Sequence, residues 1–266
     1  MDNRGMVRGG VCCLLAIPIF AQTTKIPSDL RFEVASFKST VVKRPDYGIR
    51  PAPGGQRYEA WNCPIEVMIQ AAYRVKPEQI VGGPGWLRTD PYDMEAKAEK
   101  PSSAEELHGM LINLLVDRLA LKFHRETRDM RRYSLTLDQG GPKLTPHPGA
   151  NPGELWIDQS AEKILHIKLK GTASPMDYFA YRLSLLLDLP VVDRTGLTGA
   201  YDFTVEYTRD LPVGFPPGAK LNGEEPDTSG PRVFQAVKQQ LGLELKADKG
   251  PVDVIVIDSA ERPAGN

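Results

Sequence analysis

The sequence has few residues that could form covalent cross-links. It contains three cysteines in 266 residues, and Cys12 and Cys13 lie in an N-terminal apolar stretch that we expect to be removed. Only Cys63 then remains, so no intramolecular disulfide can form and hydrophobic cores must supply the stability. We expect Cys63 to pack as a small buried residue at the start of a helix.

Long apolar runs and an excess of one charge are also missing. After the N-terminal stretch, no apolar run approaches the roughly 18 residues expected of a transmembrane helix. Lys and Arg total 33 against 34 Asp and Glu, which gives a formal net charge of −1. A balanced charge argues against a nucleic-acid partner. We therefore expect no nucleic acid and no transmembrane segment after removal of the leader.

The signature motifs of common enzyme classes do not occur. There is no G-x-S-x-G motif, and the four histidines, His108, His124, His147 and His166, include no pair at zinc-binding spacing. Gly82-Gly83-Pro84-Gly85-Trp86 lacks the GKS or GKT ending of a phosphate-binding loop and is expected to be a tight connection between two strands. We predict no catalytic residue, no cofactor and no metal site, and we place each histidine on the surface.

The first residues have the pattern of an export signal. Arg4 and Arg8 precede an apolar run, Val11–Phe20, that is too short to span a bilayer as a helix. Ala21 supplies a small residue, so residues 1–21 are predicted to be a signal peptide cleaved before Gln22. We expect the mature protein to be periplasmic or extracellular, while a retained N-terminal anchor and a lipoprotein are weaker alternatives.

Two stretches of the chain repeat one another. Pro64 lies 111 residues before Pro175, and Tyr92-Asp93 lies 109 residues before Tyr201-Asp202. Such constant offsets predict two tandem related halves. We place the first half at 22–138, a linker rich in Pro and Gly at 139–163, and the second half at 164–266.

Each half is predicted to be an α+β unit, a small mixed or antiparallel sheet with two helices packed on it in a βαββαββ-like order. Residues 92–98 and 201–207 alternate apolar and polar side chains, which predicts half-buried strands. Ser102 or Ser103 with Glu105 or Glu106 predicts a capping box, and Ser174 is the predicted N-cap of a helix in the second half.

Five residues are weak candidates for a functional surface. His124 and Arg125 open the charged run 124–132, which we expect to be a solvated hairpin between two strands. Asp93 and Asp202 share one place in the repeat, which favours a structural role such as bonding backbone amides; with Asp90 and Glu206 they do not follow EF-hand spacing. Trp156 is a candidate exposed aromatic.

In combination, several segments resemble a family of exported proteins of unknown function expanded in acidobacterial genomes, the domain of unknown function 3738 or "Soli" family. The segments that carry the resemblance are Phe32–Lys38, Gly82–Leu87, Tyr92–Ala98, Leu115–Thr127, Gly140–Leu144, Pro190–Phe203 and Val256–Pro263. The resemblance implies secretion, and implies that similar domains can be fused behind membrane-bound metallopeptidase sensors. Each half is more faintly similar to the short N-terminal modules of secretins and outer-membrane receptors, which bind partners and do no chemistry. Fold alone does not fix function.

These observations favour a non-catalytic exported module that binds a protein, a peptide or an envelope ligand, and we expect a cell-envelope protein or peptide as partner. One alternative is an uncharacterised hydrolase with a site between the halves, which a cleft flanked by His124, Asp93 or Asp202 would favour. Others are a sensor or regulatory domain and a structural spacer with an exposed sheet edge, such as Val254–Asp258.

Overall fold

The computed structural model describes residues 27, 29–40, 46–52, 54–148, 156–161, 165–221 and 223–263. The predicted signal peptide, its cleavage site and part of the predicted linker lie outside these residues. The described residues form an α+β structure, as predicted, with three four-stranded sheets among them. Two hydrophobic cores organise the molecule into a first lobe and a second lobe.

The first lobe is built on an antiparallel sheet. Across the sheet, its strands are β1 (Val34–Ser39), β5 (Pro91–Lys97), β3 (Arg57–Pro64) and β2 (Gly48–Pro51). Tyr92, Met94 and Ala96 of β5 are buried while the residues between them are exposed, which confirms the predicted alternation. Helices α1 (Ile65–Tyr73), α2 (Trp86–Thr89) and α3 (Ala104–Leu119) share this core with the sheet.

The second lobe has a similar composition of elements. Across its antiparallel sheet, the strands are β7 (Thr145–Pro146), β11 (Tyr201–Thr208), β9 (His166–Ser174) and β8 (Trp156–Ala161). Helices α4 (Met176–Ser184) and α5 (Val233–Leu241) join the sheet in the second core. Phe203, Val205 and Tyr207 of β11 point into that core, as the alternation predicts.

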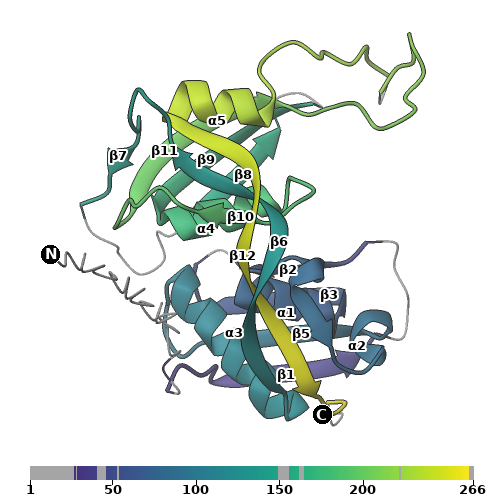
Figure 1. Ribbon diagram of the computed structural model, residues 1–266. Helices are drawn as coiled ribbons and strands as arrows, with labels where there is room; N and C mark the ends of the chain where they lie inside the picture. The colour runs from purple at the N-terminus through teal and green to yellow at the C-terminus, as the bar shows by residue number, and fades with distance from the viewer. Residues whose placement is uncertain are drawn as a thin grey trace, which may run out of the picture.

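The third sheet connects the lobes. Its strands are β10 (Val191–Asp193), β6 (Lys122–Leu137), β12 (Leu243–Ser259) and β4 (Ile80–Gly82), the last preceded by the short helix η1 (Pro77–Gln79). The long strands β6 and β12 pair antiparallel and run side by side from one lobe to the other, and we call this pair the ribbon (Figure 1). The short strands β10 and β4 pair parallel with β6 and β12 respectively.

Each strand of the ribbon contributes to both lobes. Leu135 of β6 is buried in the second core, whereas Ile255 and Ile257 of β12 are buried in the first. The predicted boundaries place both isoleucines in the second half, but their side chains complete the first core. The two cores therefore do not separate at a single point of the chain.

The predicted hairpin at 124–132 is wrong, because this segment is a continuous part of β6. Every residue from His124 to Arg132 lies opposite a residue of β12, which provides backbone partners along the whole segment. The segment also lacks Gly, Pro and Asn, three of the residues that favour tight turns. The many charged residues of this segment indicate that it is exposed, but they do not indicate that the backbone turns there.

The N-terminus of α3 agrees with the sequence prediction, whereas the N-terminus of α4 differs from it. The capping box of α3 is confirmed, since the Ser103 hydroxyl accepts the Glu106 N–H at 3.1 Å and the Glu106 carboxylate accepts the Ser103 N–H at 2.8 Å. The prediction of Ser174 as N-cap of α4 is wrong: the N-cap is Pro175, and the Ser174 hydroxyl donates to the Pro175 carbonyl at 3.3 Å. Ser174 is instead the last residue of β9, buried opposite Tyr201.

The glycine-rich segment after β4 connects that strand to α2, and not two strands as predicted. Gly82 has a φ of 76°. A Cβ at this position would lie 2.8 Å from the Ile257 carbonyl oxygen. Glycine is therefore required where the chain turns against β12, and no anion needs to be invoked to explain it.

Candidate ligand-binding cleft between the lobes

A cleft of about 320 Å³ lies where the two lobes meet at the ribbon. The first lobe contributes residues between Tyr73 and Gln79, and the second contributes α4 together with Pro190–Asp193. The ribbon contributes Arg125 and Pro251–Asp253. This volume is at the lower end of the range for small-ligand sites, so the cleft fits a small molecule or a short peptide segment.

Arg74 holds the lobes together at one side of the cleft. It ends α1 in the left-handed conformation, with φ 56° and ψ 48°. Its guanidinium pairs with Glu105 of α3, lies 3.7 Å from Asp177 of α4, and stacks over the Tyr178 ring at 4.9 Å. The charge of Arg74 is thus already balanced within the protein.

Lys76 makes a second connection between the lobes. Its Nζ donates to the carbonyls of Ser184 and Leu187, at 3.0 and 2.5 Å, at the C-terminal end of α4. A cation at this position pairs with carbonyls that the helix leaves without partners. Gln79, which is buried, donates to the Asp253 carbonyl at 2.8 Å and so fixes the same segment to the ribbon. The cleft is therefore formed by elements that are bonded to one another.

Arg125 differs from these two cations. It is exposed, and its guanidinium lies over the Tyr73 ring at 5.7 Å. Across the described chain, no carboxylate lies within ion-pair distance of it. Asp193 and Asp253 also line the cleft and have no lysine or arginine partner among the described residues; they accept hydrogen bonds from the Thr195 N–H at 2.9 Å and the Thr127 hydroxyl at 3.3 Å.

The cleft offers binding groups and no assembled nucleophile. The Ser184 hydroxyl is buried, donates to the Ala180 carbonyl at 3.0 Å and accepts the Val191 N–H at 2.8 Å. Burial raises the pKa of Tyr181 to about 12, so this phenol stays neutral at pH 7. The described lining includes neither histidine nor cysteine. Nucleophilic catalysis needs a base beside the attacking group, and this lining does not supply one.

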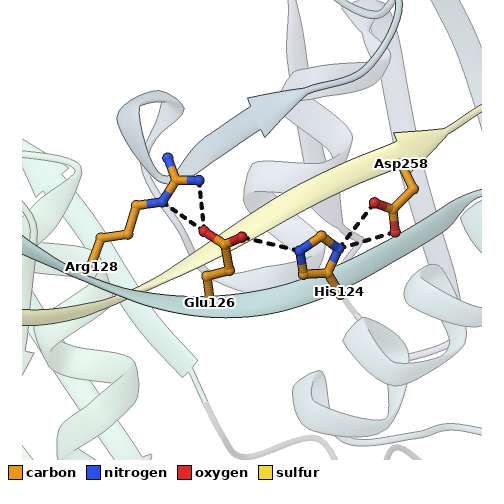
Figure 2. A network of polar contacts seen from close by, with 4 residues as sticks. All are labelled: His124, Glu126, Arg128 and Asp258. Carbon is orange, nitrogen blue, oxygen red and sulfur yellow. Dashed lines mark hydrogen bonds and ion pairs between the residues drawn. The ribbon is translucent and has the colours of Figure 1, made fainter.

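His124 belongs to a separate charged network on the ribbon (Figure 2). Its Nδ1 lies 3.0 Å from the Asp258 carboxylate and its Nε2 lies 3.2 Å from that of Glu126. Arg128 donates twice to the other oxygen of Glu126, at 2.8 and 2.7 Å. Hydrogen bonds in which the carboxylates of Asp258 and then Glu126 accept from the ring raise the pKa of His124, and the bonds that Glu126 accepts from Arg128 and then His124 lower the pKa of Glu126. With a carboxylate at each ring nitrogen, this histidine favours the protonated form.

Comparison with known proteins gives a family for this chain. Residues 66–260 match the model of the family described as Protein of unknown function (DUF3738). The chain belongs to this family. No curated protein matches the chain, and no solved structure does.

The matched region of the DUF3738 family begins in α1 and ends after β12, so it includes the described second lobe and every residue that lines the cleft, but not β1, β2 and β3 of the first lobe. Within the described residues, no helix is long and apolar enough to cross a membrane. The same residues contain no group of three or more His, Cys, Asp or Glu side chains suited to a metal ion.

Among the sequence-predicted candidates whose side chains the structure describes, only Arg125 lines the cleft. Asp93 and Asp202 bond backbone amides, as expected: they accept the N–H of Asn62 at 2.7 Å and of Ala173 at 2.8 Å. Trp156 lies in β8, but its side chain is outside the described residues.

The histidines are less uniform than predicted. His124 is exposed, as expected, but His108 is 6% exposed, which contradicts the surface position predicted for it. Its ring packs edge-on against Tyr58 of β3, at 5.6 Å, and Tyr178 of α4, at 6.3 Å, so side chains of two other elements cover this residue of α3. His147 lies 3.0 Å from Asp202, and the partly exposed His166 lies 3.2 Å from Asp227.

Sequence reasoning did not identify Arg74, Lys76 or Tyr181 as residues of the junction. Their importance depends on the meeting of two lobes, which no local pattern encodes. One signal was available: basic residues directly after a helix often pair with the free carbonyls of a helix C-terminus, although here those carbonyls belong to a helix of the other lobe.

Proposed function

We propose that this chain is an exported, non-catalytic module that binds a peptide segment of a cell-envelope protein in the cleft between its lobes. The observation that carries the proposal is the composition of the cleft: Arg125, Asp193 and Asp253 line it, and none of them has an oppositely charged partner within the described residues. A ligand with groups of both charges, such as a peptide, complements this lining.

Export is supported by the N-terminal pattern of Arg4, Arg8 and the apolar run Val11–Phe20. We also infer that the chain belongs to the acidobacterial, exported branch that its segments resemble. Expression of the full chain, followed by cell fractionation and mass spectrometry, tests both export and a mature N-terminus at Gln22. Replacement of Leu15 by Arg should retain the precursor in the cytoplasm, because a charge in the apolar run prevents its recognition as a signal.

A binding role is favoured over hydrolysis by what surrounds the cleft. The hydrolase alternative expects His124, Asp93 or Asp202 to flank it, and none of the three lines it. Steady turnover of any ester, amide or glycoside by the purified protein, abolished by one side-chain substitution, would refute the non-catalytic proposal.

The binding proposal is tested with the mature chain, residues 22–266. Phage-displayed heptapeptides are selected on the purified protein, their affinities are measured by fluorescence anisotropy, and their position is mapped from amide shifts in ¹⁵N NMR spectra. We expect perturbations at Tyr73–Gln79, α4 and Pro190–Asp193. Selected peptides that perturb only residues remote from the cleft, or a selection that enriches no peptide, would refute the proposal.

A further inference from the structure

We infer that Arg125 is the receptor for a peptide carboxylate, and this inference rests on the proposed function of the cleft. The first argument is that the cationic side chains where the lobes meet differ in whether they already have partners. Arg74 is paired with Glu105 and Asp177, and Lys76 is bonded to helix carbonyls. Arg125 has only an aromatic partner among the described residues. Arg125 can therefore bind the anionic group of a ligand without first breaking an ion pair within the protein.

The second argument is the position of the Arg125 side chain over an aromatic ring. The guanidinium lies over the Tyr73 ring at 5.7 Å, and Tyr73 is held in turn by an edge-on contact with Phe123 at 5.0 Å. A contact with a ring face takes up no N–H donor in a bond to oxygen, so the donors of Arg125 remain available for a planar anion. A carboxylate matches two parallel N–H donors, which makes it the preferred partner of an arginine held in this way.

The third argument is that the charges lining the cleft favour a carboxylate over a phosphate as the bound anion. Three aspartates line the cleft, Asp177, Asp193 and Asp253, against two arginines. A dianionic phosphate would meet repulsion from the two aspartates that lack cationic partners, whereas a carboxylate brings a single negative charge. The carboxylate could be the C-terminus of a peptide or the side chain of its Asp or Glu.

Four small probes test the inference on the ¹⁵N-labelled mature chain. They are acetyl-dialanine, which has a free C-terminal carboxylate; acetyl-dialanine amide, which has none; acetyl-aspartate amide, which has only a side-chain carboxylate; and inorganic phosphate. Binding is followed through the Nε–H signal of Arg125 and the backbone amides of the cleft. We expect one or both carboxylate probes to bind at least about tenfold more tightly than acetyl-dialanine amide and than phosphate, and their comparison identifies the carboxylate source.

Variants of the ribbon arginines provide the matched control. Arg125→Ala should lower the affinity for the preferred carboxylate probe by about 10- to 100-fold. Arg125→Lys should retain only part of the affinity, because lysine lacks the planar pair of donors. Arg128→Ala removes an exposed arginine of the same strand that is already bonded to Glu126, so binding should not change.

The outcomes distinguish this inference from the proposed function. If the amide probe or phosphate binds as tightly as the carboxylates, or if Arg125→Ala binds them normally, the carboxylate assignment is overturned while a peptide-binding cleft stands. If neither the probes nor the selected heptapeptides perturb the cleft, both are overturned. Thermal unfolding of each variant near the wild-type temperature excludes loss of folding as the cause.

Discussion

The carboxylate of Asp202 accepts the backbone N–H of Ala173 at 2.8 Å. Ala173 has a φ of 47° and lies in a bulge where β9 has one residue more than β11. In the first lobe, Asp93 accepts the N–H of Asn62 at 2.7 Å, and Asn62 also has a φ of 47° beside a register shift. In both lobes an aspartate stabilises an unfavourable backbone conformation just before the first helix of that lobe.

Replacement of Asp202 by Ala should therefore destabilise the protein. The lost bond to a charged acceptor predicts a decrease of about 1 to 2 kcal/mol in the free energy of unfolding, after allowance for an aspartate side chain that is 41% exposed. Asp202→Asn should lower the free energy of unfolding by less, since an amide oxygen can still accept the hydrogen bond from the Ala173 N–H. Urea unfolding measures both, with Glu206→Ala, an exposed position of the same strand, as a control expected within about 0.5 kcal/mol of wild type.

Acid should remove the contribution of Asp202. The Ala173 N–H, and after it His147, lower the pKa of this aspartate. A lowered pKa in the folded state means that the stabilisation is complete above the unfolded value of about 3.9 and is lost as the pH falls through the folded value. The difference in unfolding free energy between wild type and Asp202→Asn should thus shrink between pH 5 and the lowest pH at which the protein remains folded. A constant difference over this range would contradict the assignment.

His124 should show the opposite dependence on pH. Its raised pKa means that the network in Figure 2 stabilises the fold fully below the unfolded value of about 6.5 and loses this contribution as the pH rises through the folded value. An NMR titration of the His124 ring should give a midpoint above 6.5. Asp258→Asn should lower the midpoint more than Glu126→Gln, because the Asp258 bond is the larger cause. A midpoint at or below 6.5 in the wild type would show that the network does not form in solution.

The ends of α3 and α5 offer a pair of opposite substitutions. Ala120 is exposed and ends α3 with a φ of 44°, a conformation that costs a residue with a Cβ about 1 kcal/mol or more. Ala120→Gly should therefore raise the free energy of unfolding by about 1 kcal/mol. Gly242 ends α5 with a φ of 64°, and a Cβ there would lie 2.0 Å from the Gly141 carbonyl oxygen. Gly242→Ala should lower the free energy of unfolding by more than Ala120→Gly raises it. An Ala120→Gly variant less stable than wild type would contradict the strain assigned to Ala120.

Tyr73→Phe should leave stability equal or slightly higher. The Tyr73 hydroxyl is buried and has no hydrogen-bond partner within the described residues, and burial raises its pKa. Removing a buried polar group without a partner relieves a desolvation cost of about 1 kcal/mol. The ring over which Arg125 stacks is retained, so binding of the carboxylate probes should not change. A loss of more than about 1 kcal/mol in chemical unfolding would show that the hydroxyl has a partner.

Much of the secondary structure could be predicted because its causes are local. The alternation in β5 and β11 and the capping box of Ser103 and Glu106 depend on neighbouring residues, and the structure agrees with them. The continuity of β6 could not be predicted in this way, because it depends on pairing with β12 more than 100 residues away. The duplication inferred from constant spacings stays a prediction.

The candidate site was predictable only in part. The charged run on the ribbon singled out Arg125, which lines the cleft, together with His124, which does not. Asp193, Asp253 and Lys76 carry no motif, and they come together only because the ribbon brings two lobes into contact. A sequence pattern within one lobe cannot specify a site that both lobes build.

The position of Ile255 beside Ile80 in the ribbon sheet has a consequence for the order of folding. The first core cannot be completed until β12 has been synthesised, so the first lobe should remain only partly folded while β12 is missing. Contacts between such distant residues slow folding, and an equivalent strand from another copy could take the same place at high concentration. Refolding should therefore be slow, and its yield should depend on protein concentration.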